Sequence, residues 1–526
     1  MDTKALRQKI LDLAIRGKLV PQDPNDEPAS VLLERICEQK MQMVKEGKLK
    51  AKDITNDTII FVGEDNLHYE KFQDGTVKCI EDEIPFEVPE GWEWVRLVSI
   101  CLKVTDGTHH SPDNFPTGEY KYITAKNIKL NGIVLDDITY VTAEVHKEIF
   151  ARCNPEFGDI LYIKDGATSG IATVNTLHEE FSMLSSVALL KPSIGIDNWY
   201  MCYAMQSPYF YNTTRGDMKG VGITRITLNM LTSRLIPIPP QNEQRQISAN
   251  TSKLIELIVS IEKSKDDVLE LIATTKSKIL DLAIRGKLVP QDSNDEPASI
   301  LLERIRAEKE ELIKQGKIKR DKKKSVIFKG DDNSYYQQTG DLIESISTWE
   351  LEELPDNWVL CCLGELCDYG NCNNVDADSI AGNAWILDLE DIEKNTGKVL
   401  RKIRKNERDF TSTKHSFYKG QVLYSKLRPY LNKVIIADED GFCTSEILPL
   451  EFANVVLPQY ALYYLMSPTF LRYAKQCSYG VKMPRLGTAD GRKAIFPLPP
   501  IKEQYRIANS ISKCFTQIDN ILSALL

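Results

Sequence analysis

Apolar side chains recur at helical spacing through one long stretch in the middle of the chain, between the prolines at 239–240 and Gly286. A seam that repeats every seven residues predicts a long amphipathic helix over 241–287, which needs a partner helix. Proline before the first turn and glycine after the last are typical of helix ends. One row of the seam is Ile247, Leu254, Ile261, Val268, Thr275 and Leu282, and the other is Thr251, Ile258, Lys265, Ile272 and Ile279.

The same pattern occurs a second time, divided between the two ends of the chain. Residues 501–526 repeat the first part of the central stretch, and residues 2–20 repeat its last part, 271–289. The internal repeat is therefore circular. We expect the divided copy to pair with the central helix as an antiparallel coiled coil with approximate two-fold symmetry. The C-terminal rows are Ile507, Cys514 and Ile521, and Ile511, Ile518 and Leu525.

Outside the seam, the repeat is almost perfect over one block and scattered elsewhere. Residues 9–36 and 278–305 differ only where Pro24 is replaced by Ser293 and Val31 by Ile300. Between 93–235 and 359–495 the two copies share only isolated landmarks. A common frame with divergent middles predicts one fold that presents two different surfaces. The landmarks include Pro89 and Trp92 with Pro355 and Trp358, Gly158 with Gly420, Ser207-Pro208 with Ser467-Pro468, and Glu243-Gln244 with Glu503-Gln504.

Each middle mixes short alternating runs, typical of strands, with one helical segment. We expect strands at 120–123, 159–163, 186–190, 422–424 and 433–437, and helices at 199–206 and 459–466. Charged helical stretches are expected at 30–52 and 299–324, each followed by two short strands with a turn at 63–64 or 330–331. The predicted fold class is α+β: two mixed α/β domains separated by two long antiparallel helices.

Composition narrows the functional classes. The net charge of −9, with 42% hydrophobic and 27% charged residues, is ordinary for a folded protein, and a locally basic face would still permit nucleic-acid binding. The first twenty residues lack the pattern of a signal peptide, and no apolar run is long enough for a membrane span, so we expect a cytoplasmic protein. The twelve cysteines, including the group 361, 362, 367 and 372, should then be reduced thiols and hold no metal.

Common catalytic motifs are missing. The chain contains no P-loop, no dinucleotide fingerprint after a strand, no Asn-Pro-Pro-aromatic tetrapeptide of amino-methyltransferases and no Gly-x-Ser-x-Gly elbow. We therefore expect no catalytic residue, no metal site and no cofactor in this chain.

Three polar, glycine-containing loops in the first middle are candidates for contact with DNA. They lie at 104–112, 164–170 and 218–225, and their hydroxyl, imidazole and cationic side chains suit phosphates and base edges. The adjacent histidines also allow a metal or acid–base interpretation, but no third ligand follows at a suitable spacing. The candidate residues are Thr108, His109, His110, Lys164, Thr168, Ser169, Lys219 and Arg225.

Two loops of the second middle, 425–433 and 479–485, combine cations with an aromatic ring and an amide. Arginine favours guanine and asparagine favours adenine in the major groove. Any one of these cations could equally be an ordinary solvated surface charge, but together they cluster in loops at matched positions of the two copies. The candidates here are Lys426, Arg428, Tyr430, Asn432, Lys433, Lys482 and Arg485.

Taken together, the two LDLAIRGKLVPQ segments, the helix starts IPIPPQNEQRQI and FPLPPIKEQYRI, and the loops DGTHHSP and KLRPYLNK resemble the specificity subunit of type I restriction–modification systems. The resemblance covers essentially the whole chain. It implies a noncatalytic subunit with two target-recognition domains, each reading one half of a split DNA site. It also implies double-stranded DNA, two methyltransferase subunits and restriction subunits as partners, and S-adenosylmethionine, ATP and magnesium as cofactors of those partners.

The resemblance also implies a domain order. Residues 1–20 complete the distal helix, 21–90 are a linker or insert, and 91–240 form the first target-recognition domain. Residues 241–290 form the central spacer helix, 291–352 a second linker or insert, 353–500 the second target-recognition domain, and 501–526 the C-terminal helix. The helices would set the distance between half-sites and dock the methyltransferase subunits through Ile247, Leu254, Ile258, Ile261, Ile507, Ile511 and Ile518.

Two other functional classes stay open at this point. A coiled-coil scaffold that binds only proteins would explain the helices but not the divergent, loop-rich middles. A self-contained restriction enzyme would need a methyltransferase motif and several hundred further residues. Sequence-selective DNA binding separates the first alternative from a specificity subunit, and methylation by the purified chain alone would support the second.

Overall fold

The computed structural model describes residues 2–216, 225–316, 325–332, 334–346, 354–452 and 454–525. The chain forms two compact units, Met1–Ser264 and Lys265–Leu526. The central helix α7 spans Gln241–Ile284, which confirms the long helix predicted after the paired prolines.

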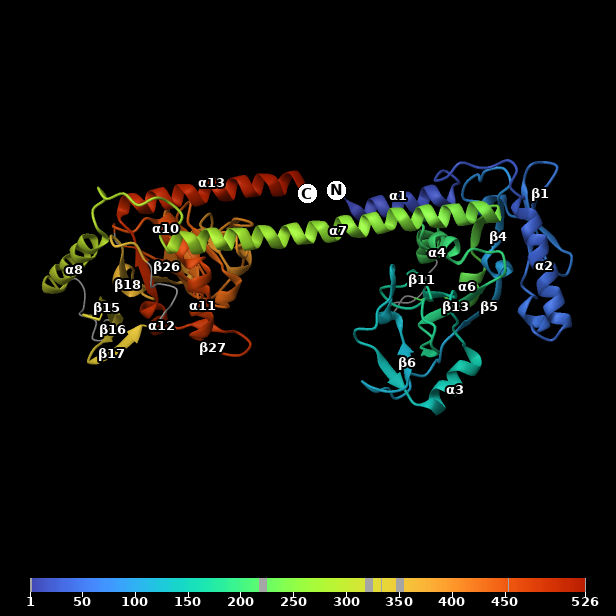
Figure 1. Cartoon of the computed structure of the whole chain (residues 1–526), viewed down its shortest axis with the longest axis horizontal. Helices are drawn as coiled ribbons and strands as arrows, with labels where there is room; N and C mark the ends of the chain where they lie inside the picture. Colours follow the sequence, from blue (N-terminus) through green and yellow to red (C-terminus); the bar gives the residue numbers. More distant parts are fainter. Residues whose placement is uncertain are drawn as a thin grey trace. The chain divides into compact units, whose positions relative to one another are not determined.

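In the first unit, α1 (Thr3–Ile15) lies beside the beginning of α7 (Figure 1). Ala14 and Ile15 share a core with Ile247, whereas Leu11 packs near Ile255. Residues later in α7 contact residues earlier in α1, so the two helices are antiparallel.

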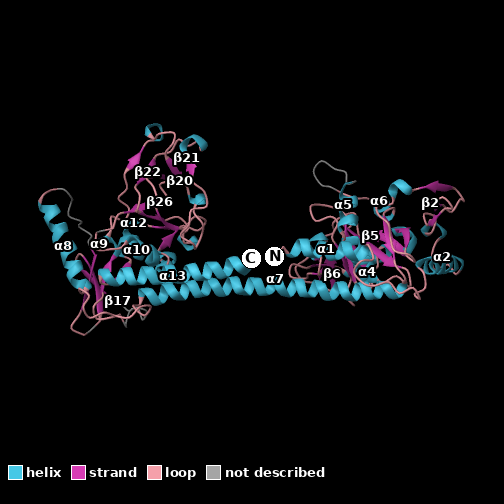
Figure 2. Cartoon of the chain, turned by 90° about the horizontal axis from the view of Figure 1, so that it is seen from above, coloured by secondary structure: helices cyan, strands magenta, loops and turns pink. Residues whose placement is uncertain are grey.

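The second unit repeats this pairing with α13 (Ile501–Leu525), which runs along the last part of α7 (Figure 2). Ile507 and Ile511 share a core with Ala283 and Ile284. The Lys276 ammonium lies 2.5 Å from an Asp519 carboxylate oxygen. Each unit thus contains one antiparallel pair, formed by part of α7 and a helix from one end of the chain.

The predicted seam is not buried along its whole length. Ile247, Ile258, Ile507 and Ile511 are buried in their own units, so these four proposed docking residues belong to the core instead. Between 259 and 271 four apolar side chains of α7 are exposed, namely Val259, Ile261, Leu269 and Leu271, and Val268 is half-buried. The heptad pattern identifies the helix but does not distinguish the covered part from the uncovered part.

We call residues 93–238 the first variable domain and residues 359–498 the second. In the first, a four-stranded sheet has the order β11-β10-β13-β5, and a three-stranded sheet has the order β12-β6-β9. The helices are α3 (Ala143–Arg152), α4 (Asn198–Gln206), α5 (Pro208–Gly216) and α6 (Leu228–Thr232), and β14 (Leu235–Ile238) pairs with β4 (Glu93–Arg96). The other strands are β5 (Cys101–Asp106), β6 (Tyr120–Ile123), β7 (Ile128–Lys129), β8 (Gly132–Ile133), β9 (Thr139–Val141), β10 (Ile160–Ile163), β11 (Ala172–Val174), β12 (Phe181–Met183) and β13 (Val187–Pro192).

The second variable domain also contains two main sheets, but the numbers of strands in them differ. Its sheets have the orders β24-β23-β26 and β19-β22-β25-β20-β21, and β18 (Val359–Cys362) pairs with β29 (Ile495–Leu498). The helices are α9 (Leu363–Leu366), α10 (Pro458–Leu465), α11 (Pro468–Gln476) and α12 (Thr488–Lys493). The other strands are β19 (Asn374–Val375), β20 (Trp385–Leu387), β21 (Ile403–Arg404), β22 (Lys414–Phe417), β23 (Val422–Ser425), β24 (Val434–Ile436), β25 (Gly441–Cys443), β26 (Ile447–Leu450), β27 (Ser478–Tyr479) and β28 (Arg485–Leu486).

All five predicted strands and both predicted helices of the variable domains are present, within a few residues of the expected bounds. The α+β fold class is confirmed. The strands of β10 and β23 are buried on both faces, since every residue of Ile160–Ile163 and Val422–Ser425 is buried.

The described parts of the two segments predicted as linkers or inserts fold against each unit's core. Helix α2 (Ala29–Lys45) buries Leu32, Ile36 and even Lys40, and α8 (Ala298–Lys314) buries the corresponding apolar positions. Each is followed by a three-stranded antiparallel sheet: β1 (Ile59–Val62), β2 (His68–Lys71) and β3 (Val77–Cys79) in one unit, and β15 (Ser325–Lys329), β16 (Tyr335–Thr339) and β17 (Leu342–Ile346) in the other. The first two strands of each sheet were predicted and the third was not. The basic stretch 317–324 lies outside the described residues.

Candidate nucleic-acid interface

Two candidate loops of the first variable domain, 104–112 and 164–170, meet beyond one end of its larger sheet, together with Arg225 of the third. The Thr108 amide donates to the Met183 carbonyl, and the Lys164 amide donates to the Ser186 carbonyl, each at 2.9 Å. The Ile226 amide donates to the Lys164 carbonyl at 3.0 Å, which brings Arg225 beside Asp165. Segments far apart in the sequence therefore form one surface.

A buried carboxylate forms ion pairs with basic side chains of this surface. Asp106, at the end of β5, is 3% exposed, and its oxygens lie 2.6 Å from the Arg152 guanidinium and 3.5 Å from the Lys164 ammonium. His109 lies 3.4 Å from the same carboxylate. Because the Lys164 side chain is only 11% exposed, it holds two loops together rather than extending into solvent.

The exposed candidates in the first domain are His109, His110, Thr168 and Arg225. Ser169 is fully buried and Thr108 is half-buried, with its hydroxyl donating to the His110 carbonyl. A direct contact of Ser169 with DNA is incompatible with this burial. Lys219 lies outside the described residues.

The second variable domain repeats the arrangement with different side chains. The Lys426 amide donates to the Glu446 carbonyl and the Leu486 amide donates to the Lys426 carbonyl, both at 3.0 Å. Lys426 therefore occupies the position of Lys164, and Arg485 occupies that of Arg225. The sequence had placed these four cations in matched loops, and the backbone contacts show that the match extends to their hydrogen bonds.

Several of the second domain's candidates are engaged with the protein itself. The Arg485 guanidinium pairs with Glu446 at 2.9 Å, and the Lys433 ammonium donates to the Leu389 carbonyl at 2.6 Å. Asn432 is 6% exposed, and its side-chain amide donates to the Met466 carbonyl at 3.4 Å. Lys426 is half-buried, whereas Arg428, Tyr430 and Lys482 are exposed.

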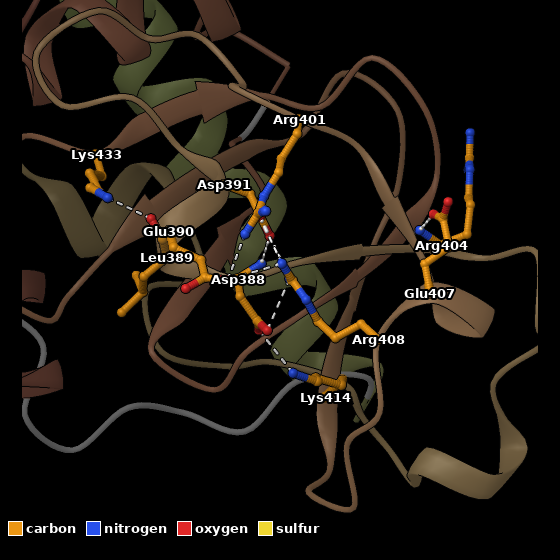
Figure 3. Close-up of polar contacts among 10 residues, drawn as sticks. All are labelled: Asp388, Leu389, Glu390, Asp391, Arg401, Arg404, Glu407, Arg408, Lys414 and Lys433. Atoms are coloured by element: carbon orange, nitrogen blue, oxygen red, sulfur yellow. Dashed lines mark hydrogen bonds and ion pairs between the residues drawn. The ribbon is translucent and has the colours of Figure 1, made fainter. Parts of the chain in front are cut away.

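A network of ion pairs behind the second domain's loops was not anticipated. Figure 3 shows Arg401 and Arg408 converging on Asp391, a carboxylate with a fully buried side chain. Lys414 pairs with the neighbouring Asp388 at 2.9 Å. Burial opposes ionisation of Asp391, but the hydrogen bonds from Arg408 and Arg401 outweigh it, so the pKa of Asp391 lies below its ordinary value.

The network explains an apparent basic patch. Residues 398–408 contain six cations, which the sequence alone would suggest for phosphate binding. In the structure, Lys398, Arg401, Lys402, Arg404 and Arg408 pair with carboxylates, and Lys405 donates to two backbone carbonyls. At the matching turn of the first domain Asn127 replaces Asp391, and its side-chain oxygen accepts a hydrogen bond from the Thr124 amide. The stretch therefore stabilises a turn.

The repeated landmarks of the sequence also meet in the structure, in a cluster that we call the joint. Glu243, 2% exposed at the start of α7, accepts hydrogen bonds from the Trp92 indole at 2.8 Å and from the Gln22 amide at 3.0 Å. In the second unit, Glu503 accepts from Trp358 at 3.0 Å and from Gln291 at 2.7 Å. Burial raises the pKa of both glutamates.

Other landmarks complete the joint. The Gln244 side chain donates to the Pro239 carbonyl and accepts from the Asp197 amide, and Gln504 bonds in the same way to Pro499 and Leu457. Gly17 has φ +64°, and a Cβ there would lie 2.3 Å from Pro89. The joint thus fixes the helices to the base of each variable domain. The repeated Trp, Glu and Gln positions could be recognised in the sequence, but their function as a joint could not.

In the described ranges, no three or more His, Cys, Asp or Glu side chains form a group that could hold a metal ion. Among the helices that the structure describes, none is both long and apolar enough to cross a membrane. Burial raises the pKa of the Cys101, Cys153 and Cys202 thiols to about 12.

Two loop-bearing domains of one plan, each fixed to a long helix by the same joint, define a protein that presents two different binding surfaces. The sequence model for the type I restriction modification DNA specificity domain matches residues 89–271 and 355–524. The chain therefore belongs to this family.

Relatives among known proteins agree with the assignment. The chain is 30% identical over 414 residues to the type I restriction enzyme EcoEI specificity subunit of Escherichia coli, covering 69% of this chain and 61% of the relative. It is also 30% identical over 417 residues to the EcoAI specificity subunit of the same species, covering 70% and 63%. The matches thus span less than two thirds of either relative.

A solved structure has the same fold. It comes from work described as the structural basis of complex assembly and conformational transition of the type I R-M system. The similarity has a TM-score of 0.53 at 16% identity, and it covers 84% of this chain and 94% of the other.

Proposed function

We propose that the chain is the DNA-specificity subunit of a type I restriction–modification complex and carries out no chemical step itself. Each variable domain reads one half of a split DNA site. The observation that carries the proposal is that both segments matched by the family model form the same loop-bearing domain, with Lys164 and Lys426, and Arg225 and Arg485, at equivalent positions.

From the exposure of their side chains, we infer different tasks for the residues of the two surfaces. In the first, His109, His110, Thr168 and Arg225 contact the DNA, and Lys164 and Thr108 shape the loop. In the second, Arg428 and Lys482 supply charge and Tyr430 an aromatic face. Lys426 is available for base contacts, whereas Asn432 and Lys433 support the loop from behind.

We further infer that α7 sets the spacer between the half-sites and docks methyltransferase subunits. The helix has 44 residues, or about 66 Å at about 1.5 Å per residue. An open depression of about 480 Å³ is lined by Leu19, Asn250, Lys253, Leu254, Glu256 and Leu257. Leu257 is 59% exposed, and an exposed apolar patch of this kind favours a protein partner. Restriction subunits complete the assembly. S-adenosylmethionine, ATP and magnesium are cofactors of those partner subunits.

A domain exchange tests the proposal. The chain is assembled with its methyltransferase partner, and methylated adenines are mapped on a library of random DNA. Replacing residues 93–235 with the corresponding segment of another family member is expected to change one half of the methylated site and leave the other unchanged. Inserting a seven-residue block within 251–271 is expected to change only the spacer. If either change altered both halves, modular reading would be refuted.

The docking inference has its own test. Leu257→Glu is expected to prevent co-purification of the methyltransferase subunit, because a charge would replace an exposed apolar side chain of the depression and would be buried by the partner. Val77→Glu is the control, since Val77 is 52% exposed on β3, a strand with no buried residue. Unchanged co-purification of the Leu257 variant would exclude this part of α7 as the docking site.

A further inference from the structure

The hairpin of β27 and β28 carries an exposed apolar tip. Val481 is 101% exposed, Tyr479 is 61% exposed and Met483 is 45% exposed. Three large apolar side chains at one tip contribute nothing to the core. A local apolar surface of this kind is typical of a contact site.

The hairpin is held firmly at its base. The Arg428 amide donates to the Pro484 carbonyl at 2.7 Å, and Leu427 forms a backbone bridge with Arg485. The ion pair between Arg485 and Glu446 closes the same end. The tip is therefore presented on a backbone tied to the loop at 425–433.

A neighbouring tyrosine extends the apolar surface. Tyr430 is 51% exposed on a short helical turn, and the residues on either side of that turn, Arg428 and Asn432, have φ of 49° and 50°. Non-glycine residues in this region are strained and are often found at ligand sites. Asn432 is anchored by burial, so the strain is retained by the surrounding structure.

Cations accompany the apolar groups. Lys482 lies between Val481 and Met483 in the sequence and is exposed, as is Arg428. A positive surface with apolar groups between its charges is complementary to DNA, in which phosphates border the base edges. A two-stranded ribbon fits the major groove, about 12 Å wide, rather than the minor groove, about 6 Å wide. The only apolar group that bases present in the major groove is the thymine methyl.

We propose that the β27–β28 tip enters the major groove of the half-site read by the second variable domain, where Val481 and Met483 contact a thymine methyl. Lys482 and Arg428 bind the flanking phosphates, and Tyr430 packs beside the hairpin against the DNA. This inference rests on the proposed function and adds to it a specific apolar reading element and a base: the second half-site contains at least one A·T pair in contact with the tip.

The test uses the full chain assembled with its methyltransferase partner and a duplex bearing the mapped site. Each thymine is replaced in turn by uracil, which lacks only the methyl group. We expect one replacement in the second half-site to weaken binding about three- to tenfold, in line with the loss of a buried methyl. In Val481→Ala, the same replacement should have little further effect, because the contact is already lost.

Three variants separate the contributions. Val481→Ala should leave the salt dependence of binding unchanged, whereas Lys482→Ala should lower its slope by about one, the value for one phosphate contact. Tyr430→Ala should weaken binding to the site, because it removes the ring that packs against the DNA. Tyr418→Ala is its control and should bind like the parent: Tyr418 is 45% exposed but lies before β23, at the end of that strand away from the loop at 425–433. Thermal unfolding confirms that the variants are folded.

The outcomes are distinct. The hairpin inference is wrong, and the proposed function stands, if the complex reads two half-sites but Val481→Ala binds like the parent. The same holds if replacing thymine with uracil weakens binding equally in the parent and in Val481→Ala. A second half-site without an A·T pair also overturns it. If the parent complex shows no sequence preference at all, both proposals fail.

Discussion

Replacing Trp92 with phenylalanine tests whether the joint fixes the first unit. The substitution keeps an aromatic ring but removes the indole N–H that donates to Glu243 at 2.8 Å. Since Glu243 is 2% exposed, its carboxylate loses this donor in a place shielded from bulk water. Hydrogen bonds to charged groups contribute about 1.5–3 kcal/mol, which sets the expected loss of stability.

The duplicated joint provides a matched control. Trp358→Phe makes the same change in the second unit, where the indole lies 3.0 Å from Glu503. For a unit of this size each kcal/mol lowers the melting temperature by about 2–4 °C, so a decrease of about 3–12 °C is expected for the affected unit. Hydrogen exchange followed by mass spectrometry should show faster exchange in the first unit for Trp92→Phe and in the second for Trp358→Phe.

The smaller ring of phenylalanine also costs packing energy, so the hydrogen bond must be isolated. A double-mutant cycle of Trp92→Phe with Glu243→Ala, which removes the acceptor, gives the coupling between the two side chains. A coupling within error of zero, or faster exchange spread equally over both units, would refute the joint as a local fixing point.

Three further predictions concern the second domain's network, the first unit's buried pair and base reading. Asp391→Ala should destabilise the second unit by about 2–4 kcal/mol, because Arg408 and Arg401 lose a buried partner; urea unfolding measures this, and a loss below 1 kcal/mol would contradict it. Burial raises the pKa of Asp57 to about 6, so the folded state holds its proton more tightly than the unfolded state, and this group's contribution to stability should fall as the pH rises from about 4 to about 6. In Asp57→Asn, the urea midpoint should vary less over that range, although the variant is less stable overall because Lys40 loses its partner at 2.6 Å; an unchanged slope would count against the assignment. Lys426→Ala should reduce discrimination in the second half-site by about 1–3 kcal/mol, the value for a base contact, whereas Arg428→Ala should weaken binding about equally on all sequences, because Arg428 binds a phosphate; a loss of discrimination in the Arg428 variant would contradict that assignment.

The sequence by itself determined the frame. The circular repeat and the heptad seam predicted α7, its antiparallel partners and the two domains of one fold, because periodic burial and duplicated segments leave a direct imprint on residue order. The strands and helices of the variable domains were predicted for the same reason. The third strand of each small sheet, β3 and β17, was missed, since Val77–Cys79 has no buried residue and Leu342–Ile346 is mostly exposed.

Only the tertiary structure decided what the individual cations do. Lys164 and Lys482 look alike in the sequence, yet the first is held by Asp106, 58 positions earlier in the chain, while the second is exposed at a hairpin tip. In the same way, the basic stretch at 398–408 is neutralised largely by carboxylates of other segments, and the landmarks Trp92, Glu243 and Gln22 become one hydrogen-bonded joint. The free charge of a side chain depends on the partners that folding brings to it, and those partners come from distant positions that spacing along the chain does not specify.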